Sequence, residues 1–127
     1  MNFEKVVFGF FIVLALTLNF GFFIGDIDNP DHHDVYELFA AIVVSLIATI
    51  LKFGERTQMG AVLLATSLVA DLQLIVAAII WGFAVYATDA GMTPKVMSSI
   101  VSLSGGAMLA NAISVILLIV ETVTLRR

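Results

Sequence analysis

The sequence predicts an all-α integral membrane protein, a single antiparallel bundle of four transmembrane helices. Of its 127 residues, 61% are hydrophobic and only 13% are charged, and the mean hydropathy is +1.08. A water-soluble globule of this size needs more polar surface than that. Lipid accepts only helices or closed barrels, and the four hydrophobic stretches are too long and too apolar for barrel strands. The fold class follows from these observations.

The four predicted spans belong to one domain and cover residues 6–25, 35–53, 59–87 and 95–120. The first is uncharged throughout and matches the roughly 20 residues that cross about 30 Å of hydrocarbon as a helix. Its apolar stretch is long for a signal peptide, which is the rival interpretation. The second is short, and Tyr36 extends it at the interface. The third is interrupted only by Asp71, and the fourth carries no charge from Val96 to Val120.

Turn and cap residues separate the spans. Asp28-Asn29-Pro30 is typical of a helix start, so we expect the second helix to begin before the membrane with Asp31 and Asp34 in its first turn. Thr93-Pro94 predicts the start of the fourth helix in the same way, and Gly54 ends the second.

The basic residues predict the orientation, because Lys and Arg near span ends stay on the cytoplasmic side. Of the six basic residues, only Lys95 falls on one side of the membrane. The other side carries Lys5, Lys52, Arg56, Arg126 and Arg127. We therefore expect both termini in the cytoplasm and the loop from Asp26 to Glu37 outside.

Several function classes are excluded or disfavoured. A net charge of −4 leaves no basic surface for nucleic acid. The absence of cysteine excludes disulfides and thiolate chemistry. No phosphate loop, catalytic triad, HExxH or haem motif occurs, so we expect neither an enzyme nor a cofactor.

Asp71 is the most informative residue, since we expect it about 18 Å into a hydrocarbon core roughly 30 Å thick. A carboxylate at that depth costs about 2.5 to 3.5 kcal/mol and usually faces a protein interior or a wet cavity. The default expectation is a functional site. The alternative is a neutral or hydrogen-bonded Asp that holds helices or subunits together.

Other polar residues are expected near the level of Asp71, so that every helix supplies one. They predict an ion or proton site made of Asp71, Asn19, Ser45, Ser104 and Ser67, the last on the same helical stripe as Asp71. The alternative is that Ser and Asn merely pack membrane helices.

Small residues recur at helical spacing and predict close helix packing. They are Ser102, Gly106, Ala110 and Ser114 on the fourth span, with Gly60 and Gly82 on the stripe of Asp71. Gln73 points almost opposite to Asp71, so the third helix has two faces that lipid does not favour. We expect a homo-oligomer in the lipid bilayer; the alternative is one bundle that uses these faces internally.

The predicted outer loop is rich in carboxylates and imidazoles. These groups predict a vestibule that attracts cations, or a site that binds one. These residues are Asp26, Asp28, Asp31, His32, His33, Asp34 and Glu37. The loop does not match the calcium motif, because Pro30 takes the third ligand position and Asp31 stands where glycine is needed. The alternative is a solvated acidic helix start.

Three runs carry a resemblance: residues 2–10 (NFEKVVFGF), 18–30 (LNFGFFIGDIDNP) and 68–73 (LVADLQ). With these runs the chain resembles a family of small four-helix bacterial inner-membrane proteins of unknown function. The resemblance implies the bacterial cytoplasmic membrane and no activity. In size and layout the chain is also similar to small multidrug-resistance exporters, but those carry their essential acid in the first helix, where this sequence has Asn19.

These observations predict a homo-oligomeric inner-membrane protein that passes or transports a cation or proton through the site centred on Asp71. A second hypothesis is a non-catalytic accessory or assembly subunit of a larger membrane transporter or channel. A third is an outer-surface sensor of divalent cations or pH.

Overall fold

The computed structural model describes residues 3–125, which form four long α-helices and one short 3-10 helix. The elements are α1 (Phe3–Phe23), η1 (Pro30–His32), α2 (Val35–Lys52), α3 (Gln58–Ala87) and α4 (Pro94–Leu125). All four α-helices are long and apolar enough to cross a membrane. The predicted all-helical class and its four membrane-length helices are therefore confirmed.

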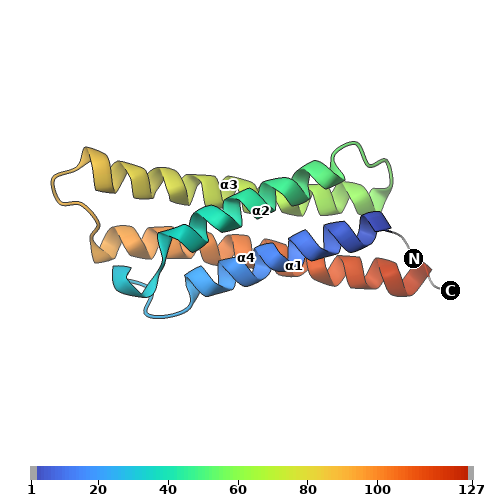
Figure 1. Cartoon of the computed structure of the whole chain (residues 1–127), viewed down its shortest axis with the longest axis horizontal. Helices are drawn as coiled ribbons and strands as arrows, with labels where there is room; N and C mark the ends of the chain where they lie inside the picture. Colours follow the sequence, from blue (N-terminus) through green and yellow to red (C-terminus); the bar gives the residue numbers. More distant parts are fainter. Residues whose placement is uncertain (1–2, 126–127) are drawn as a thin grey trace.

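The helices pack in a ring in which α1 contacts α2 and α4, and α3 contacts the same two helices. An ion pair of 2.6 Å joins Lys5 at the start of α1 to Glu121 near the end of α4. Successive helices run in opposite directions along the long axis, and both ends of the chain lie at the same end of the molecule (Figure 1). Arg126 and Arg127, which entered the orientation argument, lie outside the described residues.

The helix starts agree with the predicted signals at one loop and differ at the other. Thr93 caps α4, since its hydroxyl accepts a hydrogen bond from the Val96 N–H at 3.2 Å. Asn29, however, caps η1, and α2 starts only after Asp34, which accepts from the Tyr36 N–H at 2.9 Å. The expectation that the second helix starts at Pro30 was wrong, because the extended backbone at His33 separates the two helices.

Large apolar side chains cover much of the outside of the bundle, as lipid contact requires. Inside, the buried apolar residues form two clusters. The larger comprises Phe22, Leu38, Ala41, Ala70, Leu74, Ala77, Met97, Ile100, Val101, Ala107 and Ala110, and the smaller comprises Phe8, Ile12, Ala48 and Leu63. The smaller cluster lies nearer the end that holds the termini. Polar residues occupy the interior between the clusters.

Candidate functional site

Asp71 lies near the middle of the 30-residue α3 and is only 5% exposed. Ser45 of α2 donates a hydrogen bond to its Oδ1 at 2.7 Å. The Thr49 hydroxyl lies 2.5 Å from its Oδ2. Because Ser45 and Thr49 are four residues apart, α2 presents both hydroxyls on one face. The acid is therefore held between two helices by two hydroxyl groups.

The Thr49 hydroxyl has a second neighbour, since its Oγ1 lies 3.0 Å from the backbone oxygen of Ser45. A hydroxyl has one proton to donate, whereas a carbonyl oxygen can only accept. Both contacts can be full hydrogen bonds when Thr49 donates to the carbonyl and accepts a hydrogen bond from a protonated Asp71. This arrangement is complete with a neutral carboxyl, and one hydrogen bond is lost when the carboxyl is ionised.

A layer of buried polar residues separates the two apolar clusters. On α2, Ser45 lies between Ala41 of the larger cluster and Ala48 of the smaller, and on α3 Ser67 lies between Ala70 and Leu63 in the same way. Asp71 follows Ser67 by one helical turn. On α4 the polar residue at this boundary is Asn111, which is fully buried. Three helices thus contribute to one polar layer.

The register between α3 and α4 places Asn111 close to the level of Asp71 along the bundle. Thr66 of α3 contacts Ser114 of α4 through their hydroxyls, and Gln73 lies against Gly106. Counting from either contact, Asn111 lies opposite residues 68–69 of α3, between Ser67 and Asp71. The predicted α4 member, Ser104, lies instead two turns away along α4.

Asn19 and Ser104 form a separate contact in the bundle interior. The Ser104 Oγ lies 3.5 Å from the Asn19 Oδ1, and both side chains are fully buried. Among the described residues, no hydrogen bond joins this pair to Asp71. Of the predicted site, Ser45 contacts Asp71, Ser67 lies one turn from it, and Asn19 and Ser104 contact each other.

Sequence reasoning missed Thr49 and Asn111. Thr49 follows Ser45 by one turn, so the face that carries Ser45 also carries Thr49. The buried face of α4 contains Ser104, Ala107, Asn111 and Ser114, a spacing of three and four residues that indicates a core-facing stripe. That spacing was the available signal for Asn111.

The small residues of α4 serve mainly the contact with α3. Gly106 lies against Gln73, because a side chain there would come within 2.6 Å of the Gln73 amide. Ala110 is part of the larger apolar cluster, and Ser114 contacts Thr66, whereas Ser102 is exposed. Most of these small residues therefore pack against other parts of the same chain, as the alternative to a homo-oligomer predicts.

The two glycines predicted on the stripe of Asp71 have different surroundings. Gly60 is buried, and a side chain there would overlap the Glu55 side chain. Among the described residues, nothing lies within 4 Å of a Cβ placed at Gly82. Within the chain, therefore, only Gly60 serves a close contact.

In the loop before α2, His33 is buried and spans two parts of the chain. Its Nδ1 lies 2.5 Å from the Phe22 carbonyl oxygen and its Nε2 lies 2.7 Å from the Asp26 carbonyl oxygen. His32 is exposed, and its Nδ1 accepts from the Asp26 N–H at 2.8 Å. Both imidazoles therefore hydrogen-bond to the loop backbone.

The carboxylates of this loop do not converge on one point. Asp26, Asp28, Asp31 and Asp34 are exposed, and Glu37 is half-buried against Gly21. Among residues 3–125, no group of three His, Cys, Asp or Glu side chains is arranged to hold a metal ion. Asp34 acts as the cap of α2. The geometry is that of a solvated acidic loop.

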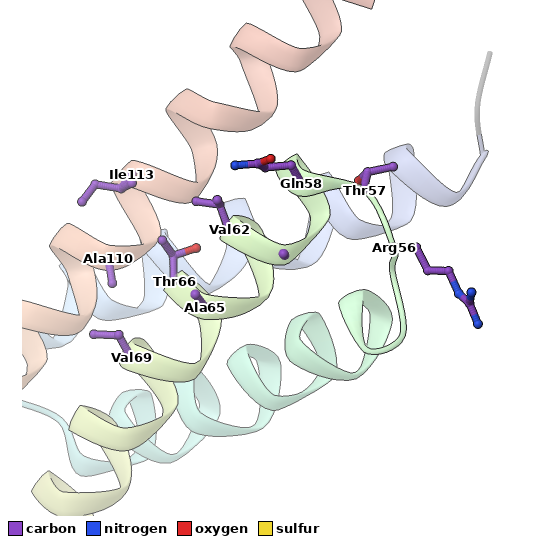
Figure 2. A pocket seen from close by; sticks show the side chains of 10 residues that line it. Arg56, Thr57, Gln58, Val62, Ala65, Thr66, Val69, Ala110 and Ile113 are labelled. Atoms are coloured by element: carbon purple, nitrogen blue, oxygen red, sulfur yellow. The ribbon is translucent and has the colours of Figure 1, made fainter.

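A groove of about 660 Å³ runs along the outside of the bundle between α3 and α4 (Figure 2). Thr57 and Gln58 lie at one end, and the Arg56 side chain there points away from α4. The rest of the lining is mostly small or apolar, comprising Ala61, Val62, Ala65, Thr66, Val69, Ala110 and Ile113. Asp71 does not line this groove, but Thr66 links its wall to Ser114 in the interior.

In a comparison with known families, the model of one family matches residues 32–122 and therefore most of the helical bundle. The chain belongs to a family of unknown function, DUF6394. The matched segment of this DUF6394 protein includes α2, α3 and nearly all of α4, and with them Asp71, Ser45, Thr49 and Asn111. Neither a curated protein nor a solved structure matches the chain.

Proposed function

We propose that this chain passes protons across a membrane and that Asp71 binds and releases them. One observation carries the proposal: the single proton of the Thr49 hydroxyl has two acceptors within reach, the Ser45 carbonyl and the Asp71 carboxyl. A carboxyl in the middle of a membrane helix costs free energy to insert, and residues of this kind usually have a function.

The two protonation states of Asp71 differ by a small movement. When Asp71 is neutral, it donates to Thr49, and Thr49 donates to the Ser45 carbonyl. When Asp71 is ionised, the Thr49 hydroxyl rotates and donates to the carboxylate, while Ser45 Oγ keeps its bond to Oδ1. Exchange therefore needs only the rotation of one hydroxyl, a fast side-chain motion.

The donor set favours a proton over a divalent metal cation. Divalent cations such as Ca²⁺ and Mg²⁺ take about six or more oxygen ligands. The side-chain groups that hydrogen-bond to Asp71 are the hydroxyls of Ser45 and Thr49, and with the two carboxyl oxygens these are too few to coordinate such an ion. A proton needs only one acceptor.

The location we propose is the bacterial cytoplasmic membrane, with both termini in the cytoplasm. Lys5 and Lys52 lie at the end of the bundle that holds the termini, as does Arg56 in the loop after α2. Lys95 lies at the opposite end, in the first turn of α4. The basic residues therefore concentrate at the end that the positive-inside rule assigns to the cytoplasm.

Proton flux into liposomes tests the proposal. Purified protein is reconstituted with a pH-sensitive dye inside, and the flux driven by a pH gradient is compared for the wild type and Asp71→Asn. We expect Asp71→Asn to lower the flux at least tenfold. Asp28→Asn, the same substitution at an exposed loop position, serves as the control and leaves the flux unchanged. Equal flux in wild type and Asp71→Asn contradicts the mechanism.

The groove between α3 and α4 favours a second candidate, an accessory subunit whose groove receives a helix of a larger transporter or channel. Its small residues, Ala61, Ala65 and Ala110, allow close approach of another helix. This candidate predicts no proton flux from the protein alone. A homo-oligomer is proposed only through faces outside the α3–α4 contact, such as the one at Gly82, and cross-linking of Gly82→Cys in liposomes tests it.

A further inference from the structure

Asn111 has no hydrogen-bond partner for either atom of its side-chain amide among the described residues, although it is fully buried. The Ser67 hydroxyl is likewise buried without a hydrogen-bond partner among the described residues. Leaving such a group unpaired costs about 1 to 3 kcal/mol, so buried polar groups normally bind either protein or ordered water. Water is the natural partner where several such groups lie close together.

These two residues lie close to the level of Asp71 along the bundle. Asn111 is opposite residues 68–69 of α3, and Ser67 and Asp71 flank that point, as the register of α3 with α4 requires. Both residues belong to the polar layer between the two apolar clusters. A water molecule bound there has the two or more polar partners that it needs.

Polar side chains link this layer to the groove between α3 and α4, whose far end lies at one end of the bundle. Ser114 lies one turn beyond Asn111 on α4 and contacts Thr66. Thr66 lies in the wall of the groove, and Gln58 lies at the groove's end, beside the loop after α2 (Figure 2). The groove thus approaches the polar layer from the end that holds the termini.

We propose that Asn111 and Ser67 hold a short chain of water that connects Asp71 with this end of the groove. Asn111 is then a positioning residue, which orients the water that exchanges protons with Asp71. The inference rests on the proposed proton transfer for its function, but the hydration itself can be measured separately.

Single cysteines test the hydration, because the chain contains no cysteine of its own. Asn111→Cys and Ser67→Cys are treated in liposomes with a small, positively charged methanethiosulfonate reagent, which reacts with thiols in contact with water. The control is Ala107→Cys, a fully buried position of the larger apolar cluster one turn away on α4. We expect both test positions to react at least tenfold faster than the control, and faster from the side of Arg56. Reaction at the control rate in both variants overturns the proposal.

Flux and stability of Asn111→Leu separate this inference from the proposed function. A water-positioning role predicts at least a tenfold loss of proton flux with unchanged or increased stability, since an unpaired polar group has been removed. If Asp71→Asn abolishes flux while Asn111→Leu retains it, the water chain is wrong and the Asp71 mechanism stands. If Asp71→Asn retains flux, the mechanism is wrong, and the cysteine reactivity still decides whether the layer is hydrated.

Discussion

The contact between Thr49 and Asp71 makes a quantitative prediction for Thr49→Val, which keeps the shape of the side chain and removes its hydroxyl. The substitution loses one bond between helices, to Asp71 Oδ2, and one within α2, to the Ser45 carbonyl. Side-chain hydrogen bonds between membrane helices average about 0.6 kcal/mol and reach about 1.7. The unpaired Asp71 oxygen adds about 1 kcal/mol or more. We expect Thr49→Val to destabilise the protein by about 2 kcal/mol.

A double-mutant cycle with Asp71→Leu isolates the pair. In the Asp71→Leu background, Thr49→Val loses only its bond to Ser45, so we expect a cost of about 0.5 kcal/mol and a coupling of about 1.5. The assay is reversible unfolding in mixed detergent micelles, followed by circular dichroism. Thr17→Val is the matched control, because Thr17 is exposed and bonds only to Leu14 of its own helix. A coupling below about 0.5 kcal/mol, the scatter for independent sites, refutes the assigned contact.

Three further predictions concern the loops. His33→Phe keeps a ring but loses both carbonyl contacts, so it should lower the free energy of unfolding by about 1 to 3 kcal/mol. His32→Phe, at an exposed position, should lower it clearly less. Equal costs would contradict the structural role of His33. Gly25→Ala should lower the free energy of unfolding by about 1 to 2 kcal/mol from its backbone alone, because the φ angle of Gly25 is +109°. The cost should exceed that of Gly54→Ala, since a Cβ at Gly25 also meets the His32 side chain at 2.7 Å and one at Gly54 meets no described residue. The reverse order in thermal unfolding would contradict this. Millimolar Ca²⁺, Mg²⁺ or Zn²⁺ should leave the melting temperature unchanged, because the loop carboxylates do not converge, and a saturable rise would instead indicate binding to the folded state.

Hydropathy was sufficient to predict the helices, because the length of a membrane span fixes how many apolar residues must follow one another. The same count predicts the depth of Asp71 in the membrane. The neighbours of Asp71 depend in addition on how each helix is rotated about its axis, which is decided by packing between helices. Ser45, expected near the level of Asp71, hydrogen-bonds to it, whereas Ser104 was expected at the level that Asn111 occupies. Equal distances along tilted helices do not give equal levels.

The loop shows a different limit of sequence reasoning. Pro30 and its preceding Asn29 are a sound start signal, but they begin a single turn, and Asp34 begins the long helix. The burial of His33 depends on carbonyl oxygens at Phe22 and Asp26, which only the folded loop brings within reach. Residue types alone, two adjacent histidines among acids, favoured a cation site. Backbone contacts of this kind leave no periodic pattern in a sequence.

In the proposed mechanism, Asp71 carries a proton that it can release. Infrared difference spectroscopy of the protein in lipid tests it directly, because a neutral carboxyl has a carbonyl-stretching band that a carboxylate lacks. We predict such a band at neutral pH, its reversible loss on titration to alkaline pH, and its absence from Asp71→Asn, with Asp28→Asn as the control that keeps it. A spectrum in which Asp71 contributes no band at neutral pH, or a band that persists at every pH, would contradict the account.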